Sequence, residues 1–238
     1  MPDDPSLLNA FYIEPDGSIV SLEEAEKMLL TNLKKCEDAM ESTVLDLVLL
    51  YCRLGQQEIA MQYLERLIAA TVDPEKKAQY FLRMGQLMEQ IRDYEGAITF
   101  YTQAFSLEPA NNTVWYFINN NLGFCLNHFN RHVEAEPYCR AAIMIDPIRQ
   151  NAYKNLGISL EGQGKFTQAA ELYIKAVAVN PADPRAFYLL EDLVRQHQEI
   201  EFELPDIWIK IEKCREAVVL ARGLQSGFSD GPGKRSDS

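Results

Sequence analysis

The sequence is short of basic residues. Its 238 residues include 23 lysines and arginines against 35 aspartates and glutamates, which gives a formal net charge of −12. A protein that binds nucleic acid needs a basic face to displace the counterions of the phosphates, so we expect no nucleic-acid partner. The acidity is compatible with basic partners, but it serves solubility equally well. Since 47% of the residues are hydrophobic and 24% are charged, we expect a globular chain.

Long apolar runs are also absent. A helix needs about 18 consecutive apolar residues to span a bilayer, and the longest candidate run, Val44 to Tyr51, is interrupted by Asp46. Residues 1–5 are acidic and contain two prolines, whereas a secretory signal begins with basic residues followed by an apolar stretch. We therefore expect no membrane insertion and a cytoplasmic location.

The sequence lacks the motifs of common enzymes and of disulfide-bonded proteins. The five cysteines are an odd number and no two have CxxC spacing, which argues against a disulfide framework or a zinc ribbon. There is no G-x-x-x-x-G-K-[ST] phosphate loop, no G-x-S-x-G nucleophile elbow and no H-E-x-x-H metal motif. We expect neither a cofactor nor enzymatic activity.

What the sequence does contain is an internal repeat. Three glycines, Gly85, Gly123 and Gly157, are each followed by two alanines and a proline at the same offsets. Gly123 and Gly157 are 34 residues apart, and Gly85 precedes Gly123 by 38 residues. The recurring residues are Ala97, Ala104 and Pro109; Ala135, Ala142 and Pro147; and Ala169, Ala176 and Pro181.

Each recurring residue has a physical reason in a pair of antiparallel helices. The glycine and the alanines are small because the two helices approach closely there. The proline ends the second helix because it lacks an N–H and fixes φ. Apolar residues stand at helical spacing between these positions, which predicts three helical hairpins. They are Phe81, Met84, Met88 and Tyr101; Leu122, Leu126 and Cys139; and Tyr153, Leu156, Leu160 and Tyr173.

This pattern resembles the tetratricopeptide repeat, whose signature is W-x2-L-G-x2-Y, then A-x3-F, then A and P. The copy at 150–183 matches best. The middle copy departs most, with Asn119 in place of the bulky aromatic and His132 at the turn between its helices. The resemblance implies an all-α fold, a right-handed superhelical α-α solenoid of helix-turn-helix repeats with capping helices at both ends.

The flanks of the repeats carry signals of their own. Ser21 and Glu24 form a capping box that predicts a helix from about 22 to 39. Residues 11–20 form either a small hairpin around a Pro-Asp-Gly turn or an extended strap. Two more helices are expected at about 184–199 and 205–222. On the helix predicted at about 22–39, the face expected to be buried consists of Leu22, Ala25, Met28, Leu29 and Leu33.

These signals divide the chain into five parts. A worn fourth repeat is expected before the clear ones, since Tyr51, Ala60, Leu64 and Leu67 fit its helices while Val48 replaces its glycine. The parts are 1–40, an N-terminal strap and capping helix; 41–77, a degenerate repeat; 78–183, three repeats at 78–111, 116–149 and 150–183; 184–222, C-terminal capping helices; and 223–238, a disordered tail.

The resemblance also implies where a ligand binds. In this family the inner surface is lined by positions 2, 5, 6, 9, 12 and 13 of each repeat, and we expect a peptide-binding groove formed by residues at these positions. They are Gln79, Leu82, Arg83 and Gln86 of the first clear repeat; Phe117, Asn120, Asn121, Phe124, Asn127 and His128 of the second; and Asn151, Lys154, Asn155 and Ile158 of the third.

These residue types suit an extended peptide, because asparagine offers the donor and the acceptor that a peptide backbone needs. Asn121 and Asn155 occupy the same position in adjacent repeats, which resembles the asparagine ladder of O-linked N-acetylglucosamine transferase; the alternative is that they are ordinary solvated residues. Phe117 and Phe124 are interpreted as groove anchors, with core packing as the alternative. A clamp for a C-terminal carboxylate is not expected, since Leu82 stands where that clamp requires a cation.

One cluster of potential metal ligands lies within the middle repeat. Cys125, His128, His132 and Cys139 are close in sequence. However, Cys139 falls at a packing position of the second helix and His132 takes the aromatic position of the turn. We therefore expect no metal site.

Repeat folds host many functions, so the fold alone implies a binding module. We expect a non-catalytic adaptor or scaffold that holds an extended protein or peptide segment in the groove. Two alternatives stay open: a small chaperone for secretion or assembly clients, and a structural array built by self-association, which includes a homo-oligomer.

Overall fold

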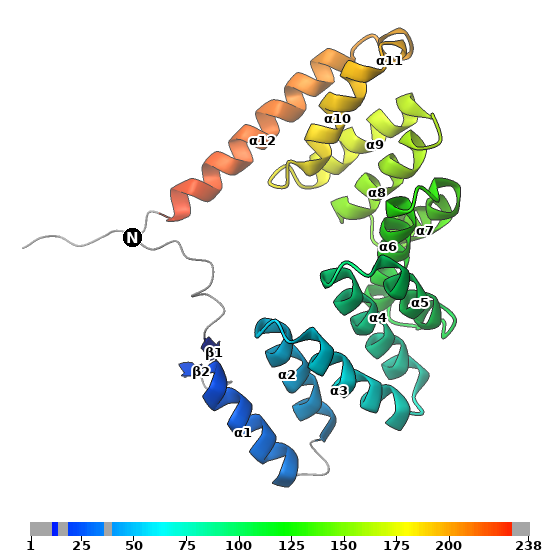
Figure 1. Cartoon of the computed structure of the whole chain (residues 1–238). Coiled ribbons are helices and arrows are strands. Elements are labelled where there is room, and N and C mark those ends of the chain that lie inside the picture. The colour runs from blue at the N-terminus through cyan, green and yellow to red at the C-terminus, as the bar shows by residue number, and fades with distance from the viewer. Residues whose placement is uncertain (1–10, 14–18, 36–39, 230–238) are drawn as a thin grey trace, which may run out of the picture. The chain divides into compact units, whose positions relative to one another are not determined.

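The computed structural model describes residues 11–13, 19–35 and 40–229 of the chain (Figure 1). They form two compact units that divide at the start of one helix, residues 1–114 and 115–238. Each unit is a succession of helices in which neighbours along the chain pack together. None of the described helices has the length and apolar character needed to cross a membrane.

The elements follow one another without long loops. They are β1 Phe11–Ile13, β2 Ile19–Ser21, α1 Leu22–Lys35, α2 Met40–Arg53, α3 Gln57–Ala70, α4 Pro74–Gln90, α5 Tyr94–Phe105, α6 Asn112–His128, α7 His132–Ile145, α8 Gln150–Glu161, α9 Phe166–Val179, α10 Arg185–Gln196, α11 Glu199–Glu203 and α12 Ile207–Ser229.

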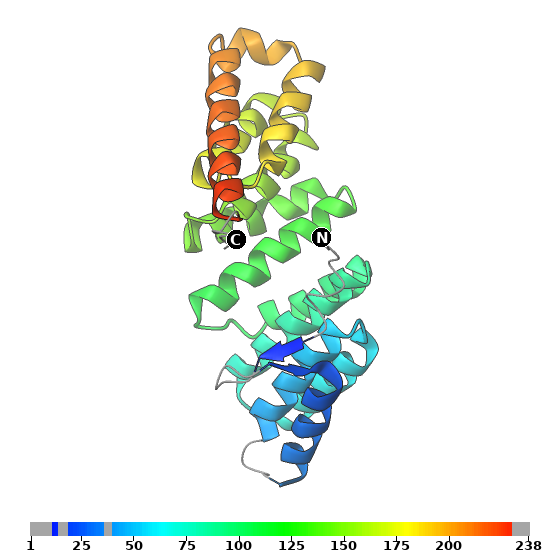
Figure 2. The ribbon, with the colours of Figure 1, turned by 90° about the vertical axis from the view of Figure 1, so that its left-hand side faces the viewer.

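The chain opens with a β-hairpin followed directly by α1. Strands β1 and β2 are antiparallel, with Phe11 opposite Ser21, and they pack beside α1 (Figure 2). Of the two alternatives for this segment, the hairpin is therefore the one that forms; its Pro-Asp-Gly turn lies outside the described residues. The capping box is confirmed, because Ser21 Oγ accepts from Glu24 N–H at 3.2 Å and Glu24 Oε2 accepts from Ser21 N–H at 3.1 Å.

Helix α1 buries a narrower stripe than expected. Leu22, Ala25 and Leu29 are buried, but Met28 is 42% exposed, so its assignment to the buried face was wrong. The physical reason is that α1 packs against α2 and the hairpin and Met28 lies beside that stripe. The Leu33 side chain and the predicted last residues of the helix, 36–39, lie outside the described part.

The repeat landmarks are explained by an interlock between the two helices of a pair. Gly85 of α4 faces the ring of Tyr101 on α5, and Gly157 of α8 faces Tyr173 on α9; a Cβ atom at either glycine would overlap the ring. Both tyrosines have no exposed surface. Each ring ends in a hydrogen bond to the first helix, from Tyr101 Oη to Glu89 and from Tyr173 Oη to Glu161. Glycine is therefore required to seat an aromatic ring as well as to let the helices approach.

The first helix pair of the chain, α2 and α3, lacks this interlock. Val48 stands at the glycine position and is 3% exposed, and Tyr51 on the same helix is 5% exposed. On α3, Ala60 and Leu64 have no exposed surface. The pair thus packs through aliphatic side chains, which is why its sequence departs from the repeat pattern while its helices persist.

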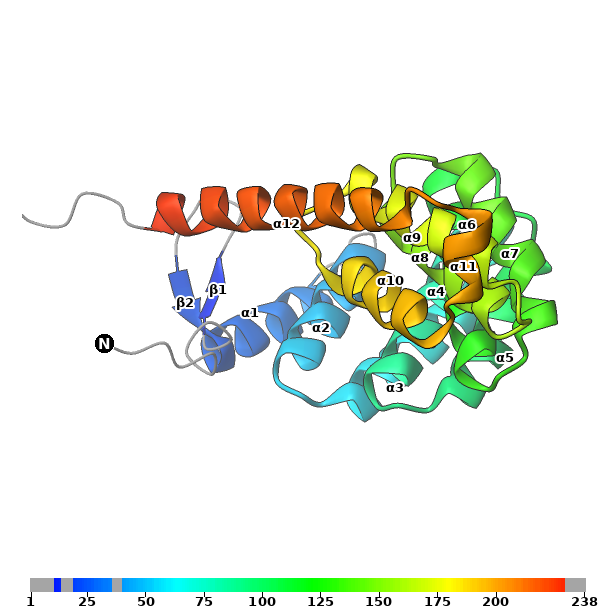
Figure 3. The ribbon, with the colours of Figure 1, turned by 90° about the horizontal axis from the view of Figure 1, so that it is seen from above.

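Between residue 184 and the end of the described part, the chain forms three helices where the sequence predicted two. Short helix α11 lies between α10 and α12, and α12 packs along both α9 and α10 (Figure 3). Glu191 replaces the glycine on α10. Its Oε1 forms an ion pair with Nη2 of Arg215 on α12, at a distance of 2.6 Å. Helix α12 continues to Ser229, so the expected disorder of 223–229 was wrong; residues 230–238 lie outside the described part.

Candidate functional site

The expected ligand residues of the second unit form two stripes on neighbouring first helices. On α6, Phe117, Asn121, Phe124 and His128 are spaced by three or four residues, and so are Asn151, Lys154 and Ile158 on α8. All are half-buried except His128, which is exposed. We call Phe117, Asn121, Phe124, Asn151, Lys154 and Ile158 the first-helix face.

Three of the asparagines expected in the groove are buried between the helices instead. Asn120, Asn127 and Asn155 are 7%, 7% and 2% exposed. Asn155 Nδ2 donates to Asn120 Oδ1 at 3.1 Å, which ties α8 to α6. An amide used in this way has little surface left for a partner. Direct peptide contact by these three residues therefore does not agree with the structure, because their positions coincide with the close crossing of α6 and α8.

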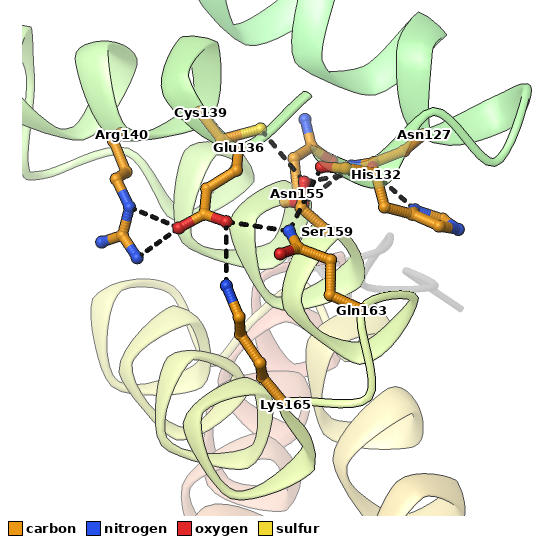
Figure 4. A network of polar contacts seen from close by, with 9 residues as sticks. All are labelled: Asn127, His132, Glu136, Cys139, Arg140, Asn155, Ser159, Gln163 and Lys165. Carbon is orange, nitrogen blue, oxygen red and sulfur yellow. Dashed lines mark hydrogen bonds and ion pairs between the residues drawn. The ribbon is translucent and has the colours of Figure 1, made fainter. Parts of the chain in front are cut away.

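Asn127 is the centre of a polar network between α6, α7 and α8 (Figure 4). Its Nδ2 donates to the Asn155 carbonyl at 2.8 Å. Its Oδ1 accepts from Ser159 Oγ at 3.0 Å and lies 3.0 Å from His132 Nδ1. Because an amide oxygen only accepts, His132 carries a proton on Nδ1. The buried Asn127 side chain thus joins the Asn155 carbonyl, the Ser159 hydroxyl and the His132 ring.

This network replaces the tyrosine interlock in the middle repeat. Asn127 stands at the position of Glu89 and Glu161, and Cys139 stands at the position of the two tyrosines. Cys139 Sγ lies 3.9 Å from Ser159 Oγ, and burial raises the pKa of this thiol to about 12. Burial thus favours the neutral thiol, whose sulfur packs closely against Gly123 of α6.

A second polar junction links α7 to the turn between α8 and α9 (Figure 4). Glu136 of α7 accepts from Arg140 at 2.7 Å, from Gln163 at 2.8 Å and from Lys165 at 3.3 Å. These contacts fix the turn between α8 and α9 to α7. Among the described residues, no group of three or more histidines, cysteines, aspartates or glutamates is arranged to hold a metal ion.

Lys154 is the cation of the first-helix face. Burial lowers its pKa, helped by the charge of Arg185 and opposed by Asp183. Arg185 is committed to Asp183, with Nε 2.9 Å from Oδ1, and this pairing lowers the pKa of Asp183 to about 2. Within the described residues Lys154 has no hydrogen bond or ion pair. Lys154 is thus a half-buried charge with which a ligand carboxylate would form an ion pair.

The four ligand residues expected from the first clear repeat lie on α4 of the first unit. Leu82 is 7% exposed and belongs to the packing of that unit, so little of it is left for a ligand. Gln79 and Gln86 are half-buried and Arg83 is exposed. A single groove from residue 79 to 158 would pass from one unit to the other, and it stays a prediction.

Comparison with known protein families identifies the repeats of the chain. Two tetratricopeptide-repeat models match it, one over residues 78–111 and the other over residues 154–198. The first has the bounds of the repeat expected there, and the second reaches from α8 into the turn after α10. Together with the glycine–tyrosine interlock, these matches show that the chain contains tetratricopeptide repeats.

Relatives share the repeats but are longer. The chain is 33% identical over 107 residues to small glutamine-rich tetratricopeptide repeat-containing protein 2 of Mycosarcoma maydis, covering 45% of this chain and 29% of that protein. It is 19% identical over 173 residues to the BBSome complex member BBS4 homolog of Drosophila melanogaster, covering 73% and 34%. The chain spans about a third of the length of these relatives.

Solved structures with the same fold show little sequence identity. MamA 41-end from Desulfovibrio magneticus RS-1 is 20% identical with a TM-score of 0.59, covering 74% of this chain and 95% of that chain. BtubC from P. vanneervenii is 19% identical with a TM-score of 0.63, covering 91% and 92%. At these identities the likeness establishes the fold alone.

Proposed function

We propose that this protein is a binding module whose first-helix face holds an extended segment of a protein partner. The observation that carries the proposal is the composition of that face: two aromatic rings, two amides, one aliphatic side chain and one unpaired cation, all half-buried on α6 and α8. Side chains of this kind give a partner apolar contact, backbone hydrogen bonds and one charge to recognise.

The buried network beneath supports this face. Because Asn155 and Asn127 tie α8 to α6, the two stripes keep their spacing before a partner arrives. Binding to a preorganised surface loses less conformational entropy than binding to a mobile one. Each hydrogen bond from Asn121 or Asn151 to a partner backbone contributes about 0.5–1.5 kcal/mol. The buried asparagines thus support binding by fixing the spacing between α6 and α8. The half-buried Asn121 and Asn151 make the contacts with the partner.

The charge of Lys154 favours a segment with an acidic side chain at one position. A carboxylate beside it would restore the pKa that burial lowers, so ligand binding and protonation are linked. Scaffolding of such a segment is the principal proposal. Protection of a client is the second, because the chain is 30% identical over 92 residues to a DnaJ homolog subfamily C member 7 homolog of Dictyostelium discoideum.

The test is partner capture by a variant that changes the first-helix face alone. Asn121→Ala, Phe124→Ala and Lys154→Ala are combined, and partners identified with the wild-type chain are measured against the variant by titration. The matched control combines Val133→Ala, Met144→Ala and Ile148→Ala, whose side chains are 72%, 85% and 81% exposed elsewhere in the same unit.

We expect the face variant to lose at least tenfold in affinity with unchanged helicity by circular dichroism, and the control to bind as the wild type does. Equal binding by the face variant and the wild type would show that this face is not the site. A partner that aggregates without the protein and stays soluble with it would favour client protection over scaffolding.

A further inference from the structure

The start of the C-terminal cap exposes large apolar side chains. Phe202 of α11 is 87% exposed, and Trp208 and Ile209 of α12 are 46% and 61% exposed. Trp208 Nε1 donates to Glu201 at 2.8 Å, which holds the two helices together at this corner. We call Phe202, Trp208 and Ile209 the α11–α12 patch.

The patch is separate from the core that the same helices build. Ile200, Ile207 and Ile211 are buried, with no more than 1% of their surface exposed, and they pack with α9 and α10. The cap thus already has the apolar residues that it needs for folding, and the three exposed ones lie outside that core. Phe202 follows Glu201 in the chain, Trp208 is hydrogen-bonded to Glu201, and Ile209 follows Trp208, so the three residues belong to one corner of the cap. Several large apolar side chains exposed at one corner indicate a contact site.

The patch residues belong to an acidic stretch of the chain. Between residues 199 and 210 the acidic residues are Glu199, Glu201, Glu203 and Asp206, all exposed, and Lys210 is the one base, so this stretch has a net charge of −3. Lys210 is paired with Asp206 at 3.0 Å. Within the described part of the chain, Glu203 has no hydrogen-bond partner.

A pocket adjoins these carboxylates. It has a volume of about 260 Å³ and is lined by Glu199 and Glu203 of α11 and by residues 164–168 at the turn into α9. Phe166 forms one wall and stacks on His197, with the ring centroids 3.5 Å apart. The lining also includes Lys165, whose ammonium pairs with Glu136 at 3.3 Å, and Glu199 lies 3.1 Å from His197 Nδ1. Glu203 and the Phe166 ring are therefore the groups left to contact a lysine or arginine side chain.

We propose that the α11–α12 patch is a second docking surface, and that its occupant is a basic amphipathic segment of a partner protein. Apolar side chains of that segment cover Phe202, Trp208 and Ile209, and one lysine or arginine enters the pocket beside Glu203 and Phe166. This surface lies on α11 and α12, apart from the α6 and α8 residues of the first-helix face, and it does not depend on the function proposed for that face.

Charge selects this occupant over the alternatives. A second copy of the chain has a net charge of −12 and would bring carboxylates against carboxylates. Nucleic acid and anionic membranes are repelled for the same reason. A basic segment gains both apolar contact and charge pairing, and the attraction accelerates its encounter with the surface.

The test titrates the full chain with three synthetic peptides of equal length. One is an amphipathic lysine–leucine helix, the second has glutamate in place of lysine, and the third has serine in place of leucine. Binding is followed by fluorescence anisotropy of the labelled peptide and by the NMR shift of the Trp208 indole N–H. We expect the lysine–leucine peptide to bind at least tenfold more tightly than the other two and to shift the Trp208 signal.

Variants locate the site. Phe202→Ser combined with Ile209→Ser should weaken the lysine–leucine peptide at least tenfold, and Glu203→Lys should weaken it and reduce the salt dependence of binding. Met144→Ser with Ile148→Ser, which changes exposed apolar side chains elsewhere, should have no effect. Phe124→Ala with Lys154→Ala should also have no effect, so failure of the function proposed above and failure of this proposal are distinguishable.

Three results would overturn the proposal. The first is equal binding of the glutamate–leucine peptide, and the second is wild-type affinity in the Phe202→Ser and Ile209→Ser variant. The third is a concentration-dependent dimer in sedimentation that the same variant abolishes, which would assign the patch to self-association.

Discussion

Replacing Asn127 by alanine removes three hydrogen bonds from one buried point. The side chain donates to the Asn155 carbonyl at 2.8 Å, accepts from Ser159 at 3.0 Å and lies 3.0 Å from His132 Nδ1. Each such bond contributes about 0.5–1.5 kcal/mol net. Ser159 keeps a second acceptor, the Asn155 carbonyl at 3.0 Å, so part of the loss is recovered. The free energy of unfolding should therefore fall by about 2–3 kcal/mol.

Urea denaturation followed by tryptophan fluorescence measures this change. Asn127 and both tryptophans, Trp115 and Trp208, belong to the second unit, residues 115–238, so the fluorescence reports on the unit that the substitution affects. With a slope of about 2 kcal/mol per molar urea, the midpoint falls by about 1 M. Met144→Ala, which changes an 85% exposed side chain of the same unit, is the control and should cost about 0.5 kcal/mol or less. A loss below about 0.5 kcal/mol for Asn127→Ala, or strict additivity with Ser159→Ala, would refute the network.

Three further predictions concern the second unit. Gly157→Ala should destabilise it by about 1–3 kcal/mol in urea, because the methyl group overlaps the Tyr173 ring, whereas Gly223→Ala, with no atom within 4 Å of its Cβ, should not. The ion pair with Arg185 depresses the pKa of Asp183 to about 2, so its stabilisation is present above the ordinary carboxyl pKa of about 3.9 and is lost as the pH falls toward 2; in acid titrations, Asp183→Asn should lose less stability over this range than the wild type. Lys154→Met should raise the urea midpoint at neutral pH, since burial opposes the charge of this lysine, and should weaken partner binding; a lower midpoint would contradict this account.

Much of the fold could be predicted from the sequence because the residues that determine it are close together in the chain or recur at a fixed period. Serine and glutamate three residues apart predict a helix start wherever they occur, and Ser21 and Glu24 begin α1 as predicted. The recurring glycines mark places where a side chain of the next helix needs room, so Gly85 and Gly157 revealed the pairs α4–α5 and α8–α9. Short helix α11 carries no such signal, because its single buried residue, Ile200, gives no periodicity.

The candidate site was harder to predict because surface position depends on how closely two helices cross. Asn121 and Asn155 have the same place in their repeats, yet Asn121 is half-buried on the face and Asn155 is 2% exposed beneath it. Repeat position fixes the direction of a side chain but not the distance to the neighbouring helix. The exposure of Phe202 was not predicted, because the helices expected at about 184–199 and 205–222 left this residue in the connection between them.

The ion pair between α10 and α12 has a consequence for which kind of helix can pack against α10. Glu191 stands where earlier first helices have glycine, and Arg215 closes over it at 2.6 Å. A further tyrosine-bearing helix has no seat there, since a carboxylate and a guanidinium fill the space that an aromatic ring would take. Packing of a tyrosine-bearing helix against α10 in the manner of the earlier pairs therefore requires the loss of both charges.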